Sequence, residues 1–425
     1  MHSIRKIKRL PVIKSTPAGA GKSPPVILTV NGGSSSIKFA VYPAKKKNSD
    51  DRPLLYGNMD GIGTDRVELQ TFDARSQLLD TKQLSGRNHQ KAAAILTDFL
   101  RATPYGERIA TVGHRVVHGG IRLNRHTVIT AKVMAELEIS VPLDLAHLPR
   151  EIVLIQAMTK AFPAAIQVAC LDTAFHRNLP RVARLLPIPR SLGRAGIRRF
   201  GFHGLSYSFL MEELQRISPA RARGRVILAH LGSGASLASV NAGRPVDTTM
   251  GFTPTAGLIM ATRPGDMDPG LLVHLMRQIP LTPAAADKFI NEDCGLRGIS
   301  GRTGDMRQLH QLASHSPSCR DAIQAFCQRA RAAIAGLAAG MGGLDVLVFS
   351  GGIGEHDAAV RRDICAGLEF IGVRLNAEAN RQHRQAIAAA NAGVLTFMIP
   401  TDEQKMIARI VRKLAVAALS NRRRK

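Results

Sequence analysis

Apolar and polar positions alternate most clearly over Val26–Tyr42, VILTVNGGSSSIKFAVY. An apolar run ends in Asn-Gly-Gly-Ser-Ser-Ser, and Ile37, Phe39 and Val41 then recur at the period of a β-strand. The pattern predicts a hairpin whose turn has almost no side-chain bulk. Such a turn presents backbone N–H groups, hydroxyls and the Lys38 ammonium to an anion, so it is a candidate phosphate site as well as an ordinary glycine-rich hairpin.

The same arrangement recurs further along the chain. Val226–Val240, VILAHLGSGASLASV, predicts a second hairpin, and Val346–Glu355, VLVFSGGIGE, predicts a strand and glycine turn that lead into a helix-like run, AAVRRDICAGLEF. A glycine turn before a helix N-terminus favours an anion or nucleotide. None of the three stretches has the Walker or the dinucleotide glycine spacing. The repeats therefore predict a duplicated α/β core that closes around one nucleotide.

Three further segments have clear periodicity. The run IQVACL at 166–171 predicts a buried strand, and 320–337 predicts an amphipathic helix. Another amphipathic helix is predicted after Glu403, where Thr401-x-x-Gln404 has the spacing of a capping box.

Length and composition limit the class of protein. The 425 residues suffice for two domains, and 45% apolar content excludes wholesale disorder. The uncharged run at 332–344 is too short to span a bilayer, and no signal-peptide core begins the chain. Five cysteines without metal-type spacing predict reduced thiols. We therefore expect a cytoplasmic protein without a membrane segment.

The chain is strongly basic. Its net charge is +26, residues 1–25 contain six basic and no acidic residues, and the chain ends Arg-Arg-Arg-Lys. Such a balance attracts anions, including nucleic acid, without specifying one. The aromatic content is only 4%, with no tryptophan, so stacking platforms for nucleic acid are not expected. We expect a disordered basic extension over 1–25, a basic tail over 421–425 and no specific nucleic-acid partner.

Nine motifs in order carry a resemblance to a known family. They are VNGGSSSIKF (30–39), GHRVVHGG (113–120), LDTAFHRNLP (171–180), RRFGFHG (198–204), HLGSGAS (230–236), VDTTMGFTPTAGLIMATRPGDMDPG (246–270), GISGRTGDMR (298–307), VFSGGIGEH (348–356) and IPTDEQKMIAR (399–409). Together they resemble the acetate kinase family, short-chain acyl kinases of the actin/hexokinase superfamily. The resemblance runs from Val26 to Arg409.

The resemblance implies reversible transfer of the ATP γ-phosphoryl group to acetate, giving acetyl phosphate and ADP. It implies two duplicated α/β domains of the actin/ribonuclease-H-like fold with the active site in the cleft between them. We expect the first domain over 26–174 and 403–420 and the second over 175–402. A homodimer, and magnesium with manganese as a substitute, are also expected by similarity.

The resemblance also assigns site residues. The catalytic set is Arg115, Asp172, His203 and Arg263, and the magnesium set is Asn31 and Glu403. The substrate pocket would be formed by Arg115, Val117, Ala146, Phe202 and Pro254. The nucleotide would be bound by Ser34, Ser36, Lys38, His230, Gly232, Ser233, Gly234, Asp305, Met306, Arg307, Gly351, Gly352, Ile353, Gly354 and Glu355.

Structural interpretations compete with these roles. Arg115 and Arg263 would otherwise be surface arginines, and Asp172 would cap the helix that follows it. Glu403 would be stabilised by the dipole of its own helix without any metal. Competing functions are a kinase for propionate, butyrate or another short acid, and a non-catalytic nucleotide-binding protein.

The sequence departs from the family pattern at several positions. Leu205 and Tyr207 stand where threonine and histidine are usual, which alters the surroundings of His203, and Ser233 replaces asparagine. Gly32 and Gln404 replace cysteine and glutamate. Ala146 stands where a leucine helps to close the acyl pocket, which predicts a preference relaxed toward propionate.

Overall fold

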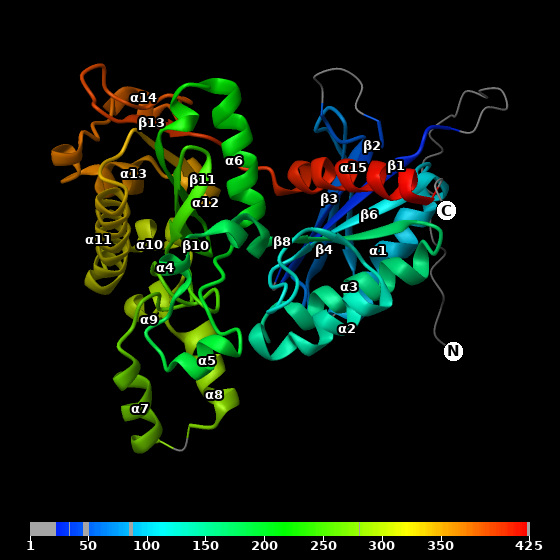
Figure 1. Ribbon diagram of the computed structural model, residues 1–425, viewed down its shortest axis with the longest axis horizontal. Helices are drawn as coiled ribbons and strands as arrows, with labels where there is room; N and C mark the ends of the chain where they lie inside the picture. The colour runs from blue at the N-terminus through cyan, green and yellow to red at the C-terminus, as the bar shows by residue number, and fades with distance from the viewer. Residues whose placement is uncertain (1–22, 34, 46–50, 85–87, 280, 423–425) are drawn as a thin grey trace.

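The computed structural model describes residues 23–33, 35–45, 51–84, 88–279 and 281–422, with the side chains of 416–422 left out. Within these residues the chain forms two mixed β-sheets side by side, each covered by helices (Figure 1). The fold class predicted from the sequence is confirmed.

The first sheet has eight strands in the order β5-β4-β3-β2-β1-β6-β8-β7. Strands β1 to β5 form an antiparallel meander, whereas β6 and β8 run parallel to β1. The strands are β1 Val26–Gly32, β2 Ser36–Pro43, β3 Leu55–Asp60, β4 Val67–Asp73, β5 Leu78–Leu84, β6 Ile109–Val116, β7 Thr127–Val128 and β8 Ile166–Leu171.

The second sheet repeats this plan with fewer strands, in the order β11-β10-β9-β12-β13. Strands β9 to β11 form the meander, and β12 and β13 are parallel to β9. The strands are β9 Arg225–Leu231, β10 Ala235–Asn241, β11 Arg244–Thr248, β12 Val346–Ser350 and β13 Leu395–Met398. Both predicted hairpins are confirmed, as β1–β2 and β9–β10.

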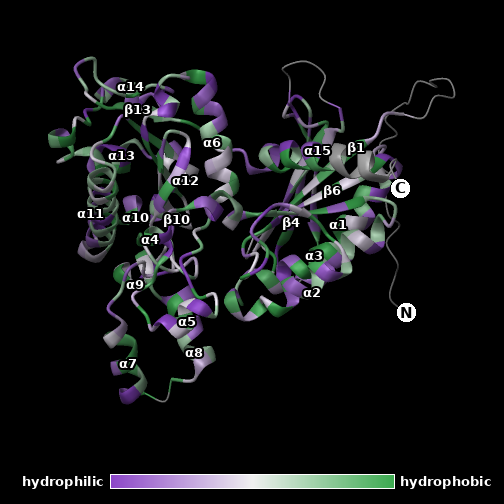
Figure 2. Ribbon diagram, viewed as in Figure 1, coloured by the Kyte–Doolittle hydropathy of each residue, from purple (hydrophilic) through white to green (hydrophobic). Residues whose placement is uncertain are grey.

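Helices cover both faces of the first sheet. Helix α1 (His89–Ala102) and helix α3 (Leu148–Ala161) bury Leu28 and Val30 of β1, whereas α15 (Glu403–Arg422) packs on the opposite face against Ile27. These helices carry polar and apolar residues side by side (Figure 2), as an amphipathic helix over a sheet requires. Helix α2 (Ala131–Ile139) packs against α3.

The second sheet is covered mainly by α11 (Pro317–Gly340) and α13 (Ala358–Cys365) on one face and by α6 (Gly204–Ile217) on the other. The predicted helix at 320–337 is therefore confirmed within α11. The remaining helices are α4 Arg181–Arg184, α5 Arg190–Arg194, α7 Pro269–Gln278, α8 Pro283–Lys288, α9 Gly295–Ser300, α10 Met306–Leu312, α12 Gly351–His356 and α14 Ala377–Arg381.

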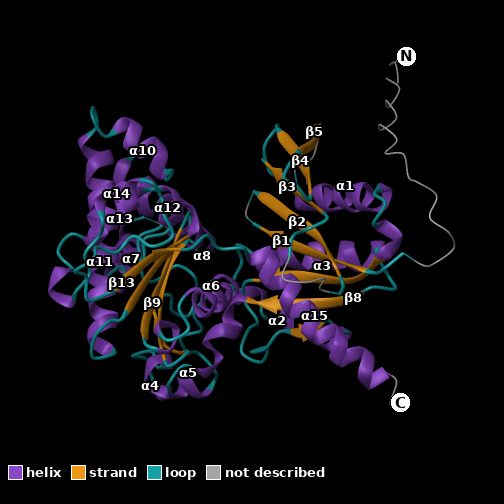
Figure 3. Cartoon of the chain, turned by 90° about the horizontal axis from the view of Figure 1, so that it is seen from above, coloured by secondary structure: helices purple, strands orange, loops and turns teal. Residues whose placement is uncertain are grey.

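Helix α6 joins the two halves of the molecule and lies between the two sheets when the chain is seen from above (Figure 3). Leu205 and Phe209 pack with α15 in the core of the first sheet, whereas Leu210 and Leu214 pack on the second sheet. The chain also passes between the halves at 399–402, directly before α15.

The capping box predicted at the start of α15 is wrong. Lys405 donates its backbone N–H to Asp402 Oδ1 (2.9 Å), so Asp402 caps the helix. The N–H of Thr401 is instead taken by Glu355 Oε1 (3.0 Å), and the buried amide atoms of Gln404 have no hydrogen-bond partner among the described residues. A nearby carboxylate from another helix has replaced the local contact.

The other sequence predictions have mixed outcomes. All five cysteines are unpaired, as predicted. No helix in the described part of the chain is long and apolar enough to cross a membrane. The basic segments at 1–25 and 421–425 lie almost wholly outside the described residues. Helix α15 packs on the first sheet, as the predicted division into domains requires, but the boundaries themselves stay a prediction.

A buried ion-pair cluster fixes α15 to the rest of the molecule, and it yields a stability prediction. Asp51 accepts from Arg409 Nε (3.0 Å) and from Arg412 Nη1 (2.6 Å), and Arg409 also contacts Glu212 of α6 (2.8 Å). We expect Asp51→Ala to lower the free energy of unfolding by about 3 kcal/mol, because two partly buried guanidinium groups lose a partner. Denaturant unfolding followed by circular dichroism measures this.

Asp80→Ala is the matched control, since Asp80 and Lys82 form an exposed pair at 3.4 Å that is worth less than about 1 kcal/mol. Burial would raise the pKa of Asp51, but hydrogen bonds from Arg409 and Arg412 lower it overall. Its stabilising effect is therefore present above the pKa of an unfolded aspartate and is lost as the pH falls through the folded value. Equal loss in both variants would contradict the assignment.

Candidate active site

A cavity of about 670 Å³ lies between the two halves of the molecule. The half of the molecule that holds the first sheet and α15, with their connecting loops, contributes Asn31, Gly33, Ser35, Ser36, Lys38, Arg115, Val117, His147, Asp172, Asp402, Glu403 and Gln404 to its lining. The second half contributes Phe202, His203, His230, Gly232, Ser233, Gly234, Pro254, Arg263, Gly351, Gly352 and Glu355, with Thr401 at the crossing.

Arg115 and Asp172 meet because β6 and β8 are parallel neighbours, with Arg115 opposite Cys170 in the register. Asp172 Oδ2 accepts from Arg115 Nε (3.0 Å) and Nη2 (2.7 Å). The Asp172 side chain is fully buried, and that of Arg115 is 17% exposed. The surface-arginine interpretation of Arg115 therefore fails, and the Asp172 carboxylate is directed at Arg115.

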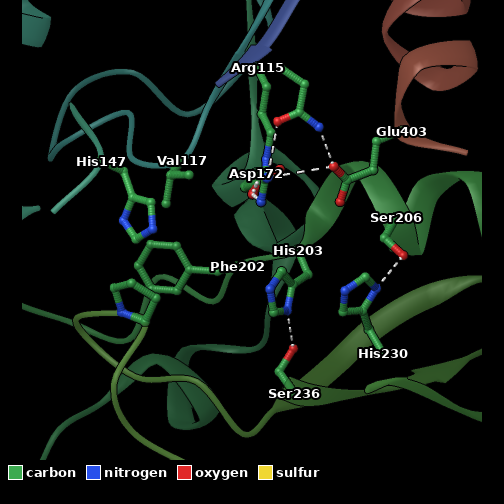
Figure 4. A network of polar contacts seen from close by, with 12 residues as sticks. Arg115, Val117, His147, Asp172, Phe202, His203, Ser206, His230, Ser236 and Glu403 are labelled. Atoms are coloured by element: carbon green, nitrogen blue, oxygen red, sulfur yellow. Dashed lines mark hydrogen bonds and ion pairs between the residues drawn. The ribbon is translucent and has the colours of Figure 1, made fainter. Parts of the chain in front are cut away.

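Asn31 extends this cluster to α15. Its Oδ1 accepts from Arg115 Nη1 (3.2 Å), and its Nδ2 donates to Glu403 Oε2 (2.7 Å). Figure 4 shows Arg115, Asp172 and Glu403 converging, with the second oxygen of Glu403 turned away from Arg115 and toward His230. Both ends of the Asn31 amide are therefore occupied by protein groups, whereas Glu403 keeps an oxygen for the cavity.

The charges in this cluster shift one another's pKa values. Burial raises the pKa of Asp172, and the charge of Glu403 adds to this effect against the opposing influence of Arg115. Burial also opposes ionisation of Glu403, but Arg115 and His230 lower its pKa overall. Burial disfavours the charge of Arg115, yet Asp172 and Glu403 raise its pKa, so the guanidinium stays positive.

Two histidines lie face to face on the other side of the cavity. The rings of His203 and His230 are 4.4 Å apart, and His203 has a left-handed backbone (φ 57°) at the residue before α6. His203 Nδ1 contacts Ser236 Oγ (2.8 Å), and His230 Nδ1 contacts Ser206 Oγ (2.9 Å). Burial lowers the pKa of both rings, so both are neutral near pH 7. Positive neighbours add to this effect at His203, whereas the charge of Glu403 opposes it at His230.

Arg263 reaches the cavity next to His203. Its Nη1 donates to the Pro254 carbonyl oxygen (2.6 Å), and burial lowers its pKa to about 10, which leaves it charged at neutral pH. A methyl group built on Gly234 would lie 2.8 Å from Arg263 Nη2 and 3.2 Å from His203 Nε2. These two nitrogens therefore flank the same point of the β9–β10 turn.

A small apolar wall adjoins these charged groups. Val117, Phe202 and Pro254 line the cavity, and His118 packs edge-on against Phe202 with ring centres 5.4 Å apart. Ala146 is half-buried and is absent from the lining, which instead includes its neighbour His147. The structure thus does not place Ala146 where the prediction of a relaxed acid preference needs it.

The glycine turns of the second sheet form the remaining wall. Gly232 donates its N–H to the Gly234 carbonyl oxygen (3.0 Å), and α12 begins at Gly351 itself, whose φ of +77° suits glycine. A side chain on Gly351 would meet the Leu231 carbonyl oxygen at 2.7 Å. Glu355 Oε1 accepts from the Gly351 N–H (2.8 Å), so this predicted nucleotide ligand also stabilises the turn.

Several predicted nucleotide residues lie outside the cavity lining. Asp305, Met306 and Arg307 lie at the start of α10, where Asp305 caps the helix, and Ile353 and Gly354 lie within α12. Helix α10 lies beside α12, because His310 Nε2 and Asp357 Oδ2 are 2.8 Å apart. Ser34 falls outside the described residues.

Sequence reasoning missed three residues that hold the site, Glu151, Ser206 and Ser236, and it noted a fourth, Tyr207, as a change beside His203. Glu151 is fully buried, and both its oxygens accept the Val117 N–H at 3.1 Å. Ser206, Tyr207 and Ser236 form hydrogen bonds behind the two histidines. For Glu151, Ser206 and Ser236 the only sequence signal is that a carboxylate or hydroxyl occurs in an apolar helix or strand.

No cluster of three His, Cys, Asp or Glu side chains in the described part of the chain can enclose a metal ion. Magnesium, however, is commonly held by one or two carboxylates, substrate phosphates and water. The oxygen of Glu403 that faces the cavity fits this mode of binding, whereas the Asn31 amide is already used on both sides.

The two related sheets, the cleft between them and its glycine turns beside paired arginines define a kinase of the actin/hexokinase-like class. A family model described as the Acetokinase family matches residues 26–409. The chain therefore belongs to the acetokinase family.

The relatives agree with this membership. An acetate kinase of Rhodopseudomonas palustris (strain TIE-1) is 40% identical over 394 residues, covering 92% of this chain and 98% of the relative. The crystal structure of Porphyromonas gingivalis acetate kinase is similar with a TM-score of 0.81 at 31% identity, covering 92% and 100%. A propionate kinase structure from Francisella tularensis has a TM-score of 0.84 at 32% identity, covering 92% and 99%.

The space at Gly234 is testable. We expect Gly234→Ala to lower the kcat of phosphoryl transfer about tenfold or more, because the added methyl displaces Arg263 and His203 from the cavity. Steady-state kinetics with a thermal-unfolding control measures this. Gly336→Ala in α11 is the matched control, since nothing lies within 4 Å of its new methyl. Unchanged kcat in Gly234→Ala would contradict this geometry.

Proposed function

We propose that this protein transfers the γ-phosphoryl group of ATP reversibly to acetate, giving acetyl phosphate and ADP. The observation that carries the proposal is the junction of two arginines and a small apolar wall in one cavity. Arg115 and Arg263 supply the charge, and Val117, Phe202 and Pro254 supply the wall. A planar guanidinium matches two oxygens of a carboxylate or of a phosphoryl group.

In this proposal the carboxylate of acetate is the nucleophile and attacks the γ-phosphorus, while ADP leaves with the bridging oxygen. Acetate is already ionised at neutral pH, so no general base is needed. Asp172 therefore orients Arg115 through their two hydrogen bonds, and its role is one of positioning. The methyl group of acetate contacts the apolar wall, which excludes water from the reacting oxygen.

Phosphoryl transfer is accelerated mainly by positioning and by neutralising the charge of the equatorial oxygens. Arg263 and Lys38 supply positive charge from opposite sides of the cavity, and His203 and His230 supply neutral N–H groups. The turns at Gly232–Gly234 and Gly351–Gly352 border the ATP phosphates in this proposal. The N–H groups of Gly232 and Gly351 are already bonded within the protein, so the other N–H groups of these turns serve the phosphates. We place the adenosine beyond them, toward Ile353, Gly354 and Asp305–Arg307.

Glu403 is the residue that we propose to hold Mg2+, or Mn2+ in its place, with Asn31 orienting the carboxylate. The bound ion would offset phosphate charge. By similarity to the family, we also propose that the protein is a cytoplasmic homodimer.

Formation of acyl phosphate tests this function. With Mg-ATP and acetate, trapping with hydroxylamine is expected to give acetohydroxamate at a rate that depends on enzyme concentration. Arg263→Ala should lower kcat by about a hundredfold or more, since it removes a charge that acts on the phosphoryl group. Arg122→Ala, whose side chain is 74% exposed, is the matched control. ATP binding without turnover would instead favour the non-catalytic alternative.

The preference among short acids is a separate question. It arises because one similar structure, from Francisella tularensis, is a propionate kinase. We expect Val117→Ala to raise the ratio of kcat/KM for propionate over acetate about tenfold, because it makes room for one methylene in the apolar wall. Ala146→Leu should leave that ratio unchanged, because Ala146 is not part of the lining. A shift with Ala146→Leu alone would restore the interpretation from sequence.

A further inference from the structure

Two hydroxyl groups lie buried behind His203, on the side away from the cavity. Ser236 of β10 contacts His203 Nδ1 at 2.8 Å, and the hydroxyl of Tyr207 in α6 is hydrogen-bonded to Ser236 Oγ. Tyr207 and Ser236 are fully buried, so no solvent reaches either hydroxyl. Figure 4 shows the hydrogen bond between Ser236 and His203.

Three protons have to be placed in this chain of contacts. The Tyr207 hydroxyl carries one, the Ser236 hydroxyl carries one, and the neutral His203 ring carries one on either Nδ1 or Nε2. Burial raises the pKa of Tyr207, which keeps the phenol protonated, and lowers that of His203, which keeps the imidazole neutral. The unknown is therefore the direction of each hydrogen bond.

One direction places all three protons. Tyr207 donates to Ser236 Oγ, Ser236 donates to His203 Nδ1, and the ring proton is then on Nε2. If Nδ1 carried the proton and donated to Ser236, either the Ser236 or the Tyr207 proton would have no acceptor among the described residues. A buried donor without an acceptor costs about 1–3 kcal/mol, so that tautomer is disfavoured.

In this tautomer the proton on Nε2 lies next to the Arg263 guanidinium. Nε2 and Arg263 Nη2 flank Gly234, at 3.2 Å and 2.8 Å from the point where a Cβ would lie, and both face the cavity. The proton on Nε2 is therefore directed at the same place as the Arg263 guanidinium. An acceptor with several oxygens can receive both donors at once.

We propose that Tyr207 and Ser236 form a hydroxyl relay that holds His203 as its neutral Nε2–H tautomer and so makes the ring a hydrogen-bond donor to the transferring phosphoryl group. Tyr207 and Ser236 are positioning residues, since neither touches the cavity. The identity of the acceptor rests on the proposed function, whereas the tautomer does not. Tyr207 stands where a histidine is usual in the family pattern, so the tyrosine hydroxyl that donates to Ser236 distinguishes this chain.

The neighbouring histidine offers a comparison. His230 Nδ1 contacts Ser206 Oγ, to which Thr401 Oγ1 donates at 2.9 Å. Thr401 lines the cavity, so its proton can turn to solvent or to a ligand if the direction reverses. The tautomer of His230 is therefore not forced in the same way, and the relay argument is specific to His203.

The tautomer can be read directly by 15N NMR of histidine-labelled, full-length protein, with His203 assigned from the spectrum of His203→Asn. We expect the Nε2–H pattern in the wild type. In Ser236→Ala, where Nδ1 loses its donor, we expect that pattern to shift toward a mixture of tautomers. Tyr207→Phe should cause a smaller shift, because Ser236 can still donate.

Kinetics of phosphoryl transfer give an independent readout. Ser236→Ala should lower kcat about tenfold to a hundredfold with little change in KM, since the lost contact acts on the transferring group. The double variant Tyr207→Phe with Ser236→Ala should lose no more than Ser236→Ala alone, because the two residues act in series. Ser239→Ala, which alters a buried serine of the same strand, and Tyr42→Phe in the first sheet are matched controls that should retain kcat.

An Nδ1–H pattern in the wild type would overturn the relay, and so would unchanged tautomer and kcat in Ser236→Ala. Additive losses in the double variant would also overturn it. Failure of the proposed function looks different, because the Nε2–H pattern would then persist in a protein that makes no acetyl phosphate.

Discussion

The buried ion pair between Arg115 and Asp172 is the interaction on which the cleft depends. Neighbouring parallel strands bring both groups to one edge of the first sheet, and Asn31 and Glu403 complete the contacts of the guanidinium. Burying either charge alone would cost several kcal/mol, so each residue requires the other. In the reaction that we propose, the nucleophile is already ionised, and the pair then gives the aspartate a positioning role: it fixes the orientation of the Arg115 guanidinium.

The duplicated sheets line two sides of the cavity with glycine-rich turns, where backbone rather than side chains faces the cavity. Each half places the turn of its first hairpin at the cavity, and α12 adds a helix start at Gly351. Glu355 links the Gly351 turn to the segment before α15, because its Oε1 accepts the N–H groups of both Gly351 and Thr401. The glycine turn of the second sheet and the Glu403 carboxylate of α15 are thus joined through one side chain.

The sequence predicted the parts of this arrangement that depend on local periodicity and on motifs. Both hairpins, the strand before Asp172 and helix α11 follow from the spacing of apolar residues, and the cavity gathers most of the predicted residues. The failures are tertiary. Helix α15 begins one residue later than the capping-box pattern predicts, so Asp402 caps it, and the Thr401 N–H is accepted by Glu355, which is far away in sequence. Ala146 lies beside the lining rather than in it, because the loop presents His147 instead.

The choice of histidine beside Arg263 follows from the same electrostatics. Arg115, Arg263 and Lys38 already place several positive charges around the cavity, and a further cation at position 203 would be repelled by them. A neutral ring avoids that repulsion and still offers an N–H to a developing charge, provided that its other nitrogen is an acceptor. Ser236 meets that condition from within the core of the second half, where solvent cannot exchange the partners of the ring. The hydroxyl groups behind His203 therefore let the cleft offer an N–H donor at this position without adding another positive charge.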